Sequence, residues 1–296
     1  MLPAEEVRHA VVGEIEIAYD TLGQATDPPV VLISGLSGQL ISWDDGFCAE
    51  LVQRGLFVVR FDNRDVGLSS HLADRPPPSA PTEVAPSYTL ADMAADTVGL
   101  LDHLGLGSAH VVGTSLGGMI AQIMAIEYPE RVRSLTSIMS TTGDGRVGQP
   151  REAAMALMLM PPVGSREDAM DRALVADRVL GSPAYRDEES HLRERAARAF
   201  DRASHPAGVA RQLAAALSTP DRTEDLRRLP LPALVIHGED DSLIGVSGGR
   251  ATAAAIPGAE LVVIDGMGHD LPRALWPTVA EQISALVTRT EEARGS

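Results

Sequence analysis

One stretch of the sequence places a nucleophile among the small residues that a sharp turn requires. Ser115 is the centre of Gly-Thr-Ser-Leu-Gly at residues 113–117, which follows an apolar run at 110–112 and leads into an apolar segment of helical period. Where a buried strand turns abruptly into a helix, small neighbours permit the strained backbone and leave the serine hydroxyl exposed at the strand end. This context indicates that Ser115 is a nucleophile.

The Gly-x-Ser-x-Gly pattern occurs a second time. Residues 245–249 read Gly-Val-Ser-Gly-Gly, but they follow a polar loop and lack the strand that would present a hydroxyl. In a chain this rich in Gly and Ser, a chance match is expected about one time in six, so the flanking elements decide between the two. Only Ser115 has a strand on one side and a helix on the other.

A serine hydroxyl is a weak nucleophile near neutral pH until a base removes its proton, and that base is commonly a histidine oriented by a carboxylate. Two late loops offer these groups, each after an apolar run of strand length. Residues 237–241 read His-Gly-Glu-Asp-Asp, and residues 265–269 read Asp-Gly-Met-Gly-His. His269, in a Gly-flanked loop, is the candidate base. His237, at a strand end, is interpreted as structural, and the carboxylate is expected in the loop that follows it.

Short apolar runs alternate with segments of helical period along most of the chain, which is typical of a sheet covered by helices on both faces. Strands are expected at residues 14–19, 30–33, 57–61, 110–112, 135–138, 234–236 and 261–264, and helices at 43–54, 90–104, 116–128 and 274–289. After the first, the strands are rich in Val, Ile and Leu, as expected of strands buried on both faces. In such an α/β sheet, ligands bind at the carboxyl ends of the strands, where Ser115 and His269 both fall.

The alternation stops in the middle of the chain. Residues 143–225 show no convincing strand but contain three segments of helical period, at 151–160, 166–180 and 187–202. We interpret this stretch as a helical cap inserted over one end of the sheet. The chain then consists of a first core part (1–142), the cap (143–225) and a second core part (226–296). Residues 73–87, which hold five prolines, are expected to form a long surface loop.

Together these motifs resemble the serine-hydrolase branch of the α/β-hydrolase fold, in which nucleophile, acid and histidine follow in this order. The resemblance covers about residues 14–142 and 229–290. It is strongest at the Ser115 turn, the two late loops, Ile-Ser-Gly-Leu at 33–36 and Asp-Asn-Arg-Asp-Val-Gly-Leu-Ser at 62–69. Within this branch the chain is similar to the aclacinomycin methylesterase type, which Arg-Asp-x-Gly at 64–67, the spacing of Trp43 after Gly35 and the ending Gly-Met-Gly-His at 266–269 all suit.

The resemblance implies roles for further residues. The acid of the family stands three residues after the Gly of His-Gly, which is Asp241 here, with Asp240 as a close alternative and Asp144 as a more distant one. The two backbone N–H groups of an oxyanion hole are expected from Leu116, directly after the nucleophile, and from Leu36. Many members have His-Gly before this second donor, where this chain has Ser-Gly at 34–35. Because the donor is a backbone amide, the difference does not remove it.

Three residues are candidate substrate contacts. They are Trp43, next to the expected oxyanion loop, and Met155 and Met158 in the expected cap. The flexible thioethers of the two methionines suit an adaptable apolar pocket, and packing of their helix against the core is the alternative. With only four Phe, two Trp and four Tyr in the chain, a cage of stacked aromatic rings is not expected.

The composition argues against several other classes of protein. Lys and Arg number 25 and Asp and Glu 41, so the net charge is −16, which repels nucleic-acid phosphates and anionic membrane surfaces. A single cysteine, Cys48, excludes an intramolecular disulfide, and no Cys, His and carboxylate spacing is zinc-like. The chain shows no signal-peptide pattern and no apolar run of 18 residues. We therefore expect a cytoplasmic protein without membrane insertion, metal or cofactor.

The sequence predicts a carboxylic-ester hydrolase that acts through Ser115, His269, Asp241 and an acyl-enzyme on a small to medium apolar ester, such as a methyl ester. Lactone hydrolysis, thioester hydrolysis and cofactor-free perhydrolysis, the haloperoxidase reaction, use the same groups and remain alternatives. A non-catalytic ligand receptor on the same fold is a further alternative. Epoxide hydrolysis and dehalogenation are disfavoured, because the members with those activities carry Asp at the position of Ser115.

Overall fold

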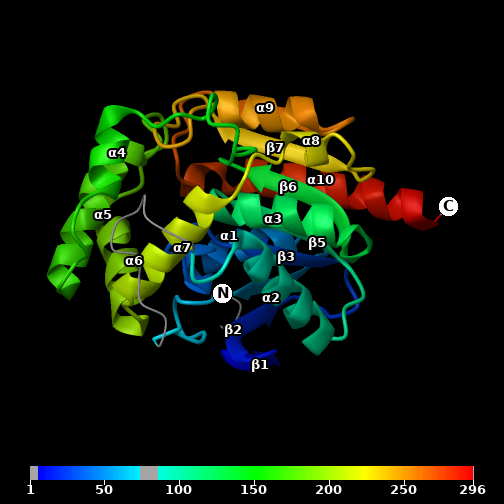
Figure 1. The fold of residues 1–296 in the computed structure, drawn as a ribbon, viewed down its shortest axis with the longest axis horizontal. Coiled ribbons are helices and arrows are strands. Elements are labelled where there is room, and N and C mark those ends of the chain that lie inside the picture. The colour runs from blue at the N-terminus through cyan, green and yellow to red at the C-terminus, as the bar shows by residue number, and fades with distance from the viewer. Residues whose placement is uncertain (1–5, 74–85, 296) are drawn as a thin grey trace.

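The computed structural model describes residues 6–73 and 86–295, which are built around an eight-stranded sheet (Figure 1). The strand order is β1-β2-β4-β3-β5-β6-β7-β8; β2 is antiparallel to both of its neighbours, and every pair from β4 to β8 is parallel. The predicted, mostly parallel α/β sheet is confirmed. The strands are β1 (Arg8–Val12), β2 (Ile15–Leu22), β3 (Pro29–Ile33), β4 (Phe57–Phe61), β5 (Ala109–Thr114), β6 (Val132–Ile138), β7 (Ala233–Gly238) and β8 (Glu260–Ile264).

Helices cover both faces of the sheet. In β3, Val31 and Ile33 join a core cluster with α2 and α3, whereas Val30 and Leu32 join a second cluster with α1 and α10. This alternation follows from the two-residue period of a strand, and it explains why β3 is apolar throughout. The helices of the core are α1 (Asp45–Val52), α2 (Leu90–His103), α3 (Leu116–Glu127), α9 (Ser247–Ala255) and α10 (Trp276–Gly295), and α8 (Thr223–Leu226) spans the boundary between residues 143–225 and the second part of the core.

Residues 143–225, called the insertion below, supply a further group of helices. Figure 1 shows them gathered to one side of the sheet, on the left of the view. They are α4 (Glu152–Met158), α5 (Arg166–Leu180), α6 (Glu189–Arg202) and α7 (Pro206–Ser218). α7 is not predicted from the sequence, and it begins directly at Pro206. Proline is tolerated in the first turn of a helix, so this residue starts α7 instead of interrupting it.

Two strands differ from the predictions. β1 is not predicted, because Ala10 is the single buried residue among its five and leaves no alternation to detect. β8 is predicted as a strand buried on both faces, which is wrong: Glu260 and Leu261 are exposed and the other three residues are half-buried. The physical reason is its position as the last strand of the sheet, with a neighbour on one side. The predicted loop at 73–87 lies largely outside the described residues.

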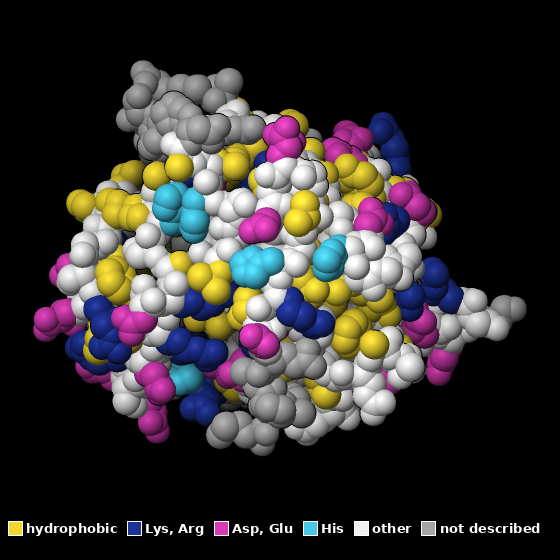
Figure 2. Space-filling model, turned by 90° about the horizontal axis from the view of Figure 1, so that it is seen from below, with side chains coloured by type: hydrophobic (Ala, Val, Ile, Leu, Met, Phe, Trp, Pro, Cys, Tyr) yellow, Lys and Arg dark blue, Asp and Glu magenta, His cyan; other side chains and the backbone are white. Residues whose placement is uncertain are grey.

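Two further features are the lack of a membrane-spanning helix among the described residues and the distribution of charged side chains on the surface. Among the described residues, no helix combines the length and the apolar character needed to cross a bilayer. On the face drawn in Figure 2, arginine and acidic side chains lie interspersed, so the net charge of −16 does not gather there into one block.

Candidate active site

Ser115 lies in the turn between β5 and α3 with a left-handed backbone, φ 53° and ψ −117°. A non-glycine residue in this region is strained, and such strain is concentrated at functional sites. Two glycines make the turn possible, because a Cβ on Gly113 would collide with the backbone of Gly117, and a Cβ on Gly117 would collide with the carbonyl of Ile33. The Gly-x-Ser-x-Gly spacing thus has a steric cause in the packing of β5, α3 and β3.

His269 reaches Ser115 from the loop after β8. Its Nε2 lies 3.0 Å from Ser115 Oγ, and its Nδ1 lies 2.7 Å from Oδ2 of Asp241. A carboxylate oxygen only accepts, so the Nδ1 atom carries the proton and Nε2 presents its lone pair to the serine hydroxyl. The imidazole is therefore oriented to accept the Ser115 proton.

Asp241 is surrounded by donors in the loop after β7. Oδ1 accepts hydrogen bonds from the backbone N–H groups of Leu243 at 2.9 Å and Ile244 at 2.8 Å, while Oδ2 faces His269 and His237. Burial alone would raise the pKa of this carboxyl, but the charge and hydrogen bonds of the two histidines hold it well below its usual range. Asp241 is an ionised acceptor behind His269.

The structure separates Asp241 from its two predicted rivals. The half-buried Asp240 is fixed through its backbone N–H, which donates to the Met267 carbonyl at 3.0 Å. Asp144 forms an ion pair with Arg146 at 2.8 Å in the segment after β6. His269 contacts Asp241 and neither of these two carboxylates among its hydrogen bonds and ion pairs in the described chain.

His237 sits behind Asp241 and is completely buried. Its Nε2 lies 2.7 Å from the Ile244 carbonyl and 3.3 Å from Asp241 Oδ2. Since a carbonyl only accepts, Nε2 carries the proton and donates toward both oxygens. The imidazole is confined further by Gly249, because a Cβ there would collide with the ring. His237 thus contacts the Ser-His-Asp chain of hydrogen bonds through Asp241.

The two expected oxyanion donors lie on either side of Ser115. Leu116 opens α3, so its N–H has no acceptor within the helix. Leu36 lies in the loop after β3, where Gly35 packs on the nucleophile: a Cβ added to Gly35 would sit 3.3 Å from Ser115 Cβ. Within residues 6–73 and 86–295, neither N–H has a protein acceptor, so both are available to an oxygen atom of a ligand.

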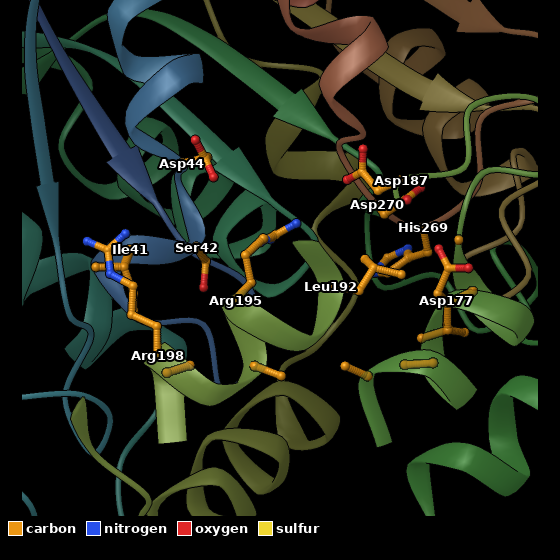
Figure 3. A pocket seen from close by; sticks show the side chains of 16 residues that line it. Ile41, Ser42, Asp44, Asp177, Asp187, Leu192, Arg195, Arg198, His269 and Asp270 are labelled. Carbon is orange, nitrogen blue, oxygen red and sulfur yellow. The ribbon is translucent and has the colours of Figure 1, made fainter. Parts of the chain in front are cut away.

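A cavity of about 320 Å³ opens at His269 between the sheet and the insertion (Figure 3). Its walls come from the turn before α1, from α5 and α6, and from the His269 loop. Figure 3 shows Arg195 and Leu192 extending from α6 toward the same space that His269 and Asp270 border. Burial raises the pKa of Asp270 to about 6, and the charges of Asp177 and Asp187 add to the increase. Of the residues that line this cavity, Asp270 could have been inferred from the sequence, because it directly follows His269.

The three predicted substrate contacts are not among the residues that line this cavity. The Trp43 side chain is 3% exposed and stacks on Phe47 within the core, at 5.5 Å between ring centroids. Met155 is 45% exposed on α4, and Met158 is half-buried one turn later. Contact of these three side chains with substrate stays a prediction.

One group of side chains in the described chain could offer three metal ligands. Asp65, His71 and His205 each have a ligand atom within 4.8 Å of the others. Both oxygens of Asp65, however, accept from the guanidinium of Arg211, at 2.7 and 2.8 Å, and Oδ1 also accepts from the Leu72 N–H. The buried Arg211 supplies the counter-charge that a cation would otherwise provide, so we assign no metal to this group.

Comparison with known proteins places this geometry in a family. A family model described as alpha/beta hydrolase fold matches residues 28–272. The rhodomycin D methylesterase DnrP of Streptomyces peucetius is 30% identical over 291 residues, which cover 92% of this chain and 95% of that protein. The 3-oxoadipate enol-lactonase 2 of Acinetobacter baylyi is 26% identical over 254 residues, covering 85% of this chain and 86% of that protein.

A solved structure agrees in fold. The enol-lactonase from Burkholderia xenovorans LB400 superposes with a TM-score of 0.72 at 22% identity, over 96% of this chain and 100% of that one. The resemblance to the methylesterase type inferred from sequence is confirmed by the 30% identity to DnrP over nearly the whole chain. The chain belongs to the α/β-hydrolase family and is a serine hydrolase, similar over most of its length to methylesterases.

Proposed function

We propose that the protein is a carboxylic-ester hydrolase that uses Ser115, His269 and Asp241 as a catalytic triad and forms an acyl-enzyme. The observation that carries this proposal is the continuous chain of contacts from Ser115 Oγ through His269 to Asp241, at 3.0 and 2.7 Å. Nucleophile and base lie within hydrogen-bond distance, and the base is oriented by a buried carboxylate, which is the arrangement that nucleophilic catalysis by serine requires.

The reaction would proceed in two half-reactions. His269 Nε2 takes the proton of Ser115, Oγ forms a bond to the ester carbonyl carbon, and the N–H groups of Leu36 and Leu116 stabilise the negative oxygen. The bond to the alcohol oxygen then breaks, and the alcohol leaves with the proton from His269. In the second half, His269 deprotonates water, which attacks the acyl carbon, and the acid departs while Ser115 regains its proton. Asp241 holds the Nδ1–H tautomer and stabilises the imidazolium.

The substrate would be a small-molecule ester of small to medium size, with a methyl ester as the first candidate. The similarity to methylesterases of Streptomyces supports this choice, and the cavity of about 320 Å³ at His269 sets its scale. We further propose that the insertion acts as a cap that shapes this cavity, because α5 and α6 provide part of its lining. The named enol-lactonase relative makes lactone hydrolysis the second candidate, because a lactone is attacked by the same groups.

The decisive experiment is a substrate panel assayed with wild type and with Ser115→Ala. The panel contains methyl esters, p-nitrophenyl esters of increasing chain length, lactones and thioesters, with peracid formation from acetate and peroxide as a separate assay. We expect ester turnover that falls at least about 10³-fold in kcat for Ser115→Ala. Lactone turnover exceeding that of every ester would reassign the substrate but keep the triad.

Two further readouts test the chemistry itself. A fluorophosphonate should label wild type at Ser115, and an unlabelled protein would indicate a ligand receptor instead of an enzyme. Because His269 must be neutral to accept the Ser115 proton, we expect kcat/KM to fall when acid protonates the imidazole. A flat profile between pH 5 and 8 would contradict the role of His269.

A further inference from the structure

We propose that the insertion is part of the catalytic machinery, because it holds two loops of the site in place through the positioning residues Ser182 and Gln212. One loop carries His269, and the other, residues 34–38, carries Leu36. The inference rests on the proposed function, which gives these two loops their roles. It extends that function by assigning to the insertion a part in catalysis besides shaping the cavity.

Ser182 follows α5 and is completely buried. Its oxygen accepts a hydrogen bond from the Gly268 N–H at 2.9 Å, and its hydroxyl donates to Oδ1 of Asp270 at 2.5 Å. These two residues are the neighbours of His269 on either side. A single side chain of the insertion therefore fixes both ends of the segment that presents the base.

Backbone contacts of the same segment reinforce this attachment. The N–H of His269 itself donates to the Leu180 carbonyl at 2.6 Å, and the Ala184 N–H donates to the Gly266 carbonyl at 3.2 Å. These two segments of the backbone lie so close together that a Cβ on Gly268 would collide with the Leu180 carbonyl. The His269 loop is thus held from outside the sheet by residues 180–184 of the insertion.

Gln212 makes the corresponding contact with the second loop. It lies in α7, is completely buried, and accepts a hydrogen bond from the Ser37 N–H at 3.2 Å through Oε1. Its Nε2 donates to the Arg64 carbonyl at 2.8 Å. Ser37 has a φ of 62°, an unfavourable conformation for a residue with a side chain, and it directly follows Leu36. The bond from Gln212 therefore stabilises a strained turn next to an oxyanion donor.

If these contacts position the two loops, their loss should change kcat. If the insertion only shapes the cavity, their loss should change KM instead. A residue that only shapes the cavity changes KM, because it contacts substrate in the ground state and the transition state alike. A residue that positions the base or the oxyanion donor changes kcat, because errors of a fraction of an ångström in the reacting geometry slow the chemical step. Neither Ser182 nor Gln212 is among the residues that line the cavity.

The test compares Ser182→Ala and Gln212→Met with matched controls in the insertion. Ser165→Ala removes the exposed N-cap hydroxyl of α5, and Gln149→Met removes an exposed amide that donates to Gly145. For each of the two positioning variants we expect kcat to fall about 10-fold with KM within about twofold of wild type. Both controls should retain wild-type kcat. A rise in KM at unchanged kcat, or an equal loss in the controls, would overturn the proposal.

A double-variant cycle checks that Ser182 acts through the base. In a His269→Ala background, Ser182→Ala should lower the residual rate by no more than about twofold, because the group it positions is already absent. Gln212→Met should keep its full effect in that background, since it acts on the other loop. A multiplicative loss for Ser182→Ala would mean a general structural role and would reject the assignment.

Hydrogen–deuterium exchange provides a readout independent of turnover. In Ser182→Ala we expect faster exchange of peptides that span 266–270, and in Gln212→Met faster exchange of peptides that span 34–38, each without loosening the other loop. Unchanged exchange in both variants would refute the proposed attachment even if the rates fell. If Ser115→Ala retains activity, the proposed function fails, yet the exchange data still decide whether the insertion holds the two loops.

Discussion

His237 and His269 both contact the same oxygen of Asp241, which lies in the loop after β7. The distances to Oδ2 are 3.3 Å from His237 Nε2 and 2.7 Å from His269 Nδ1. One carboxylate oxygen thus serves a buried histidine that cannot reach substrate and a second histidine that borders the cavity. In the proposed reaction, the completely buried ring of His237 would limit how far Asp241 can move while His269 gains and loses a proton.

Removing the donor at position 237 should therefore impair catalysis without altering the cavity. For His237→Leu we expect kcat to fall about 10-fold with little change in KM, as for other groups that orient a catalytic side chain from behind. His237→Gln, whose amide can place an N–H near the position of Nε2, should recover most of the rate. The matched control is His110→Leu, because His110 is equally buried but bonds Ser134 and Glu291. A comparable loss of kcat in that control would show that any buried histidine has this effect.

The choice of Asp241 over Asp240 can be tested by the same isosteric change at both positions. Asp241→Asn replaces the acceptor of the His269 Nδ1–H by a group that also presents a donor, so the imidazole loses its orienting charge and its tautomer. We expect kcat to fall by about 10³ to 10⁴. Asp240→Asn, one residue earlier, should stay within about twofold of wild type. The reverse order of the two losses in a steady-state assay would reassign the acid.

Gly35 offers a test of the expected oxyanion loop. A Cβ at this position would lie 3.3 Å from both Ser115 Cβ and the Thr114 carbonyl, closer than ordinary van der Waals contact. Gly35→Ala must displace either the nucleophile or the loop that carries Leu36, so we expect kcat to fall about 10-fold or more. Gly107→Ala is the control, because a Cβ there meets nothing within 4 Å. Full activity of Gly35→Ala would show that the loop can shift without consequence for the reaction.

The parts of the fold and site that follow local rules could be predicted from the sequence. Short apolar runs indicate strands such as β3. The glycines around Ser115 and His269 indicate a sharp turn or a close approach of the backbone at each position. Gln212 and Ser182 carry no such signal, because the role of an isolated amide or hydroxyl depends on a partner far along the chain. Gln212, for example, contacts Ser37, 175 residues earlier in the sequence. The role of Trp43 could not be decided from the sequence either, because a large apolar ring fits a substrate cavity and a protein core equally well.

Asp270, at the cavity next to His269, should make stability depend on pH. Burial raises its pKa to about 6, with Asp177 and Asp187 adding to the increase, whereas an unfolded aspartate titrates near 3.9. The native state therefore binds more protons between about pH 4 and 6, so this residue lowers the free energy of unfolding as the pH rises through that window, and the penalty is complete above it. Asp270→Asn removes the charge and keeps an acceptor for Ser182. In urea unfolding we expect this variant to exceed wild type by about 1 to 3 kcal/mol at pH 8 and to approach it at pH 4.

The control for this prediction is Asp240→Asn, the same chemical change at a half-exposed position of the neighbouring loop. If the difference between this control and wild type followed the same pH window, burial of the Asp270 carboxyl would not be the cause of the effect. For each variant, the quantity to compare is its difference from wild type in free energy of unfolding, measured at pH 4 and at pH 8. Titration of the other groups is common to variant and wild type, so it cancels in this difference. A gap between Asp270→Asn and wild type that is constant across this range would mean that a lost or gained packing contact, and not the charge, accounts for the change in stability.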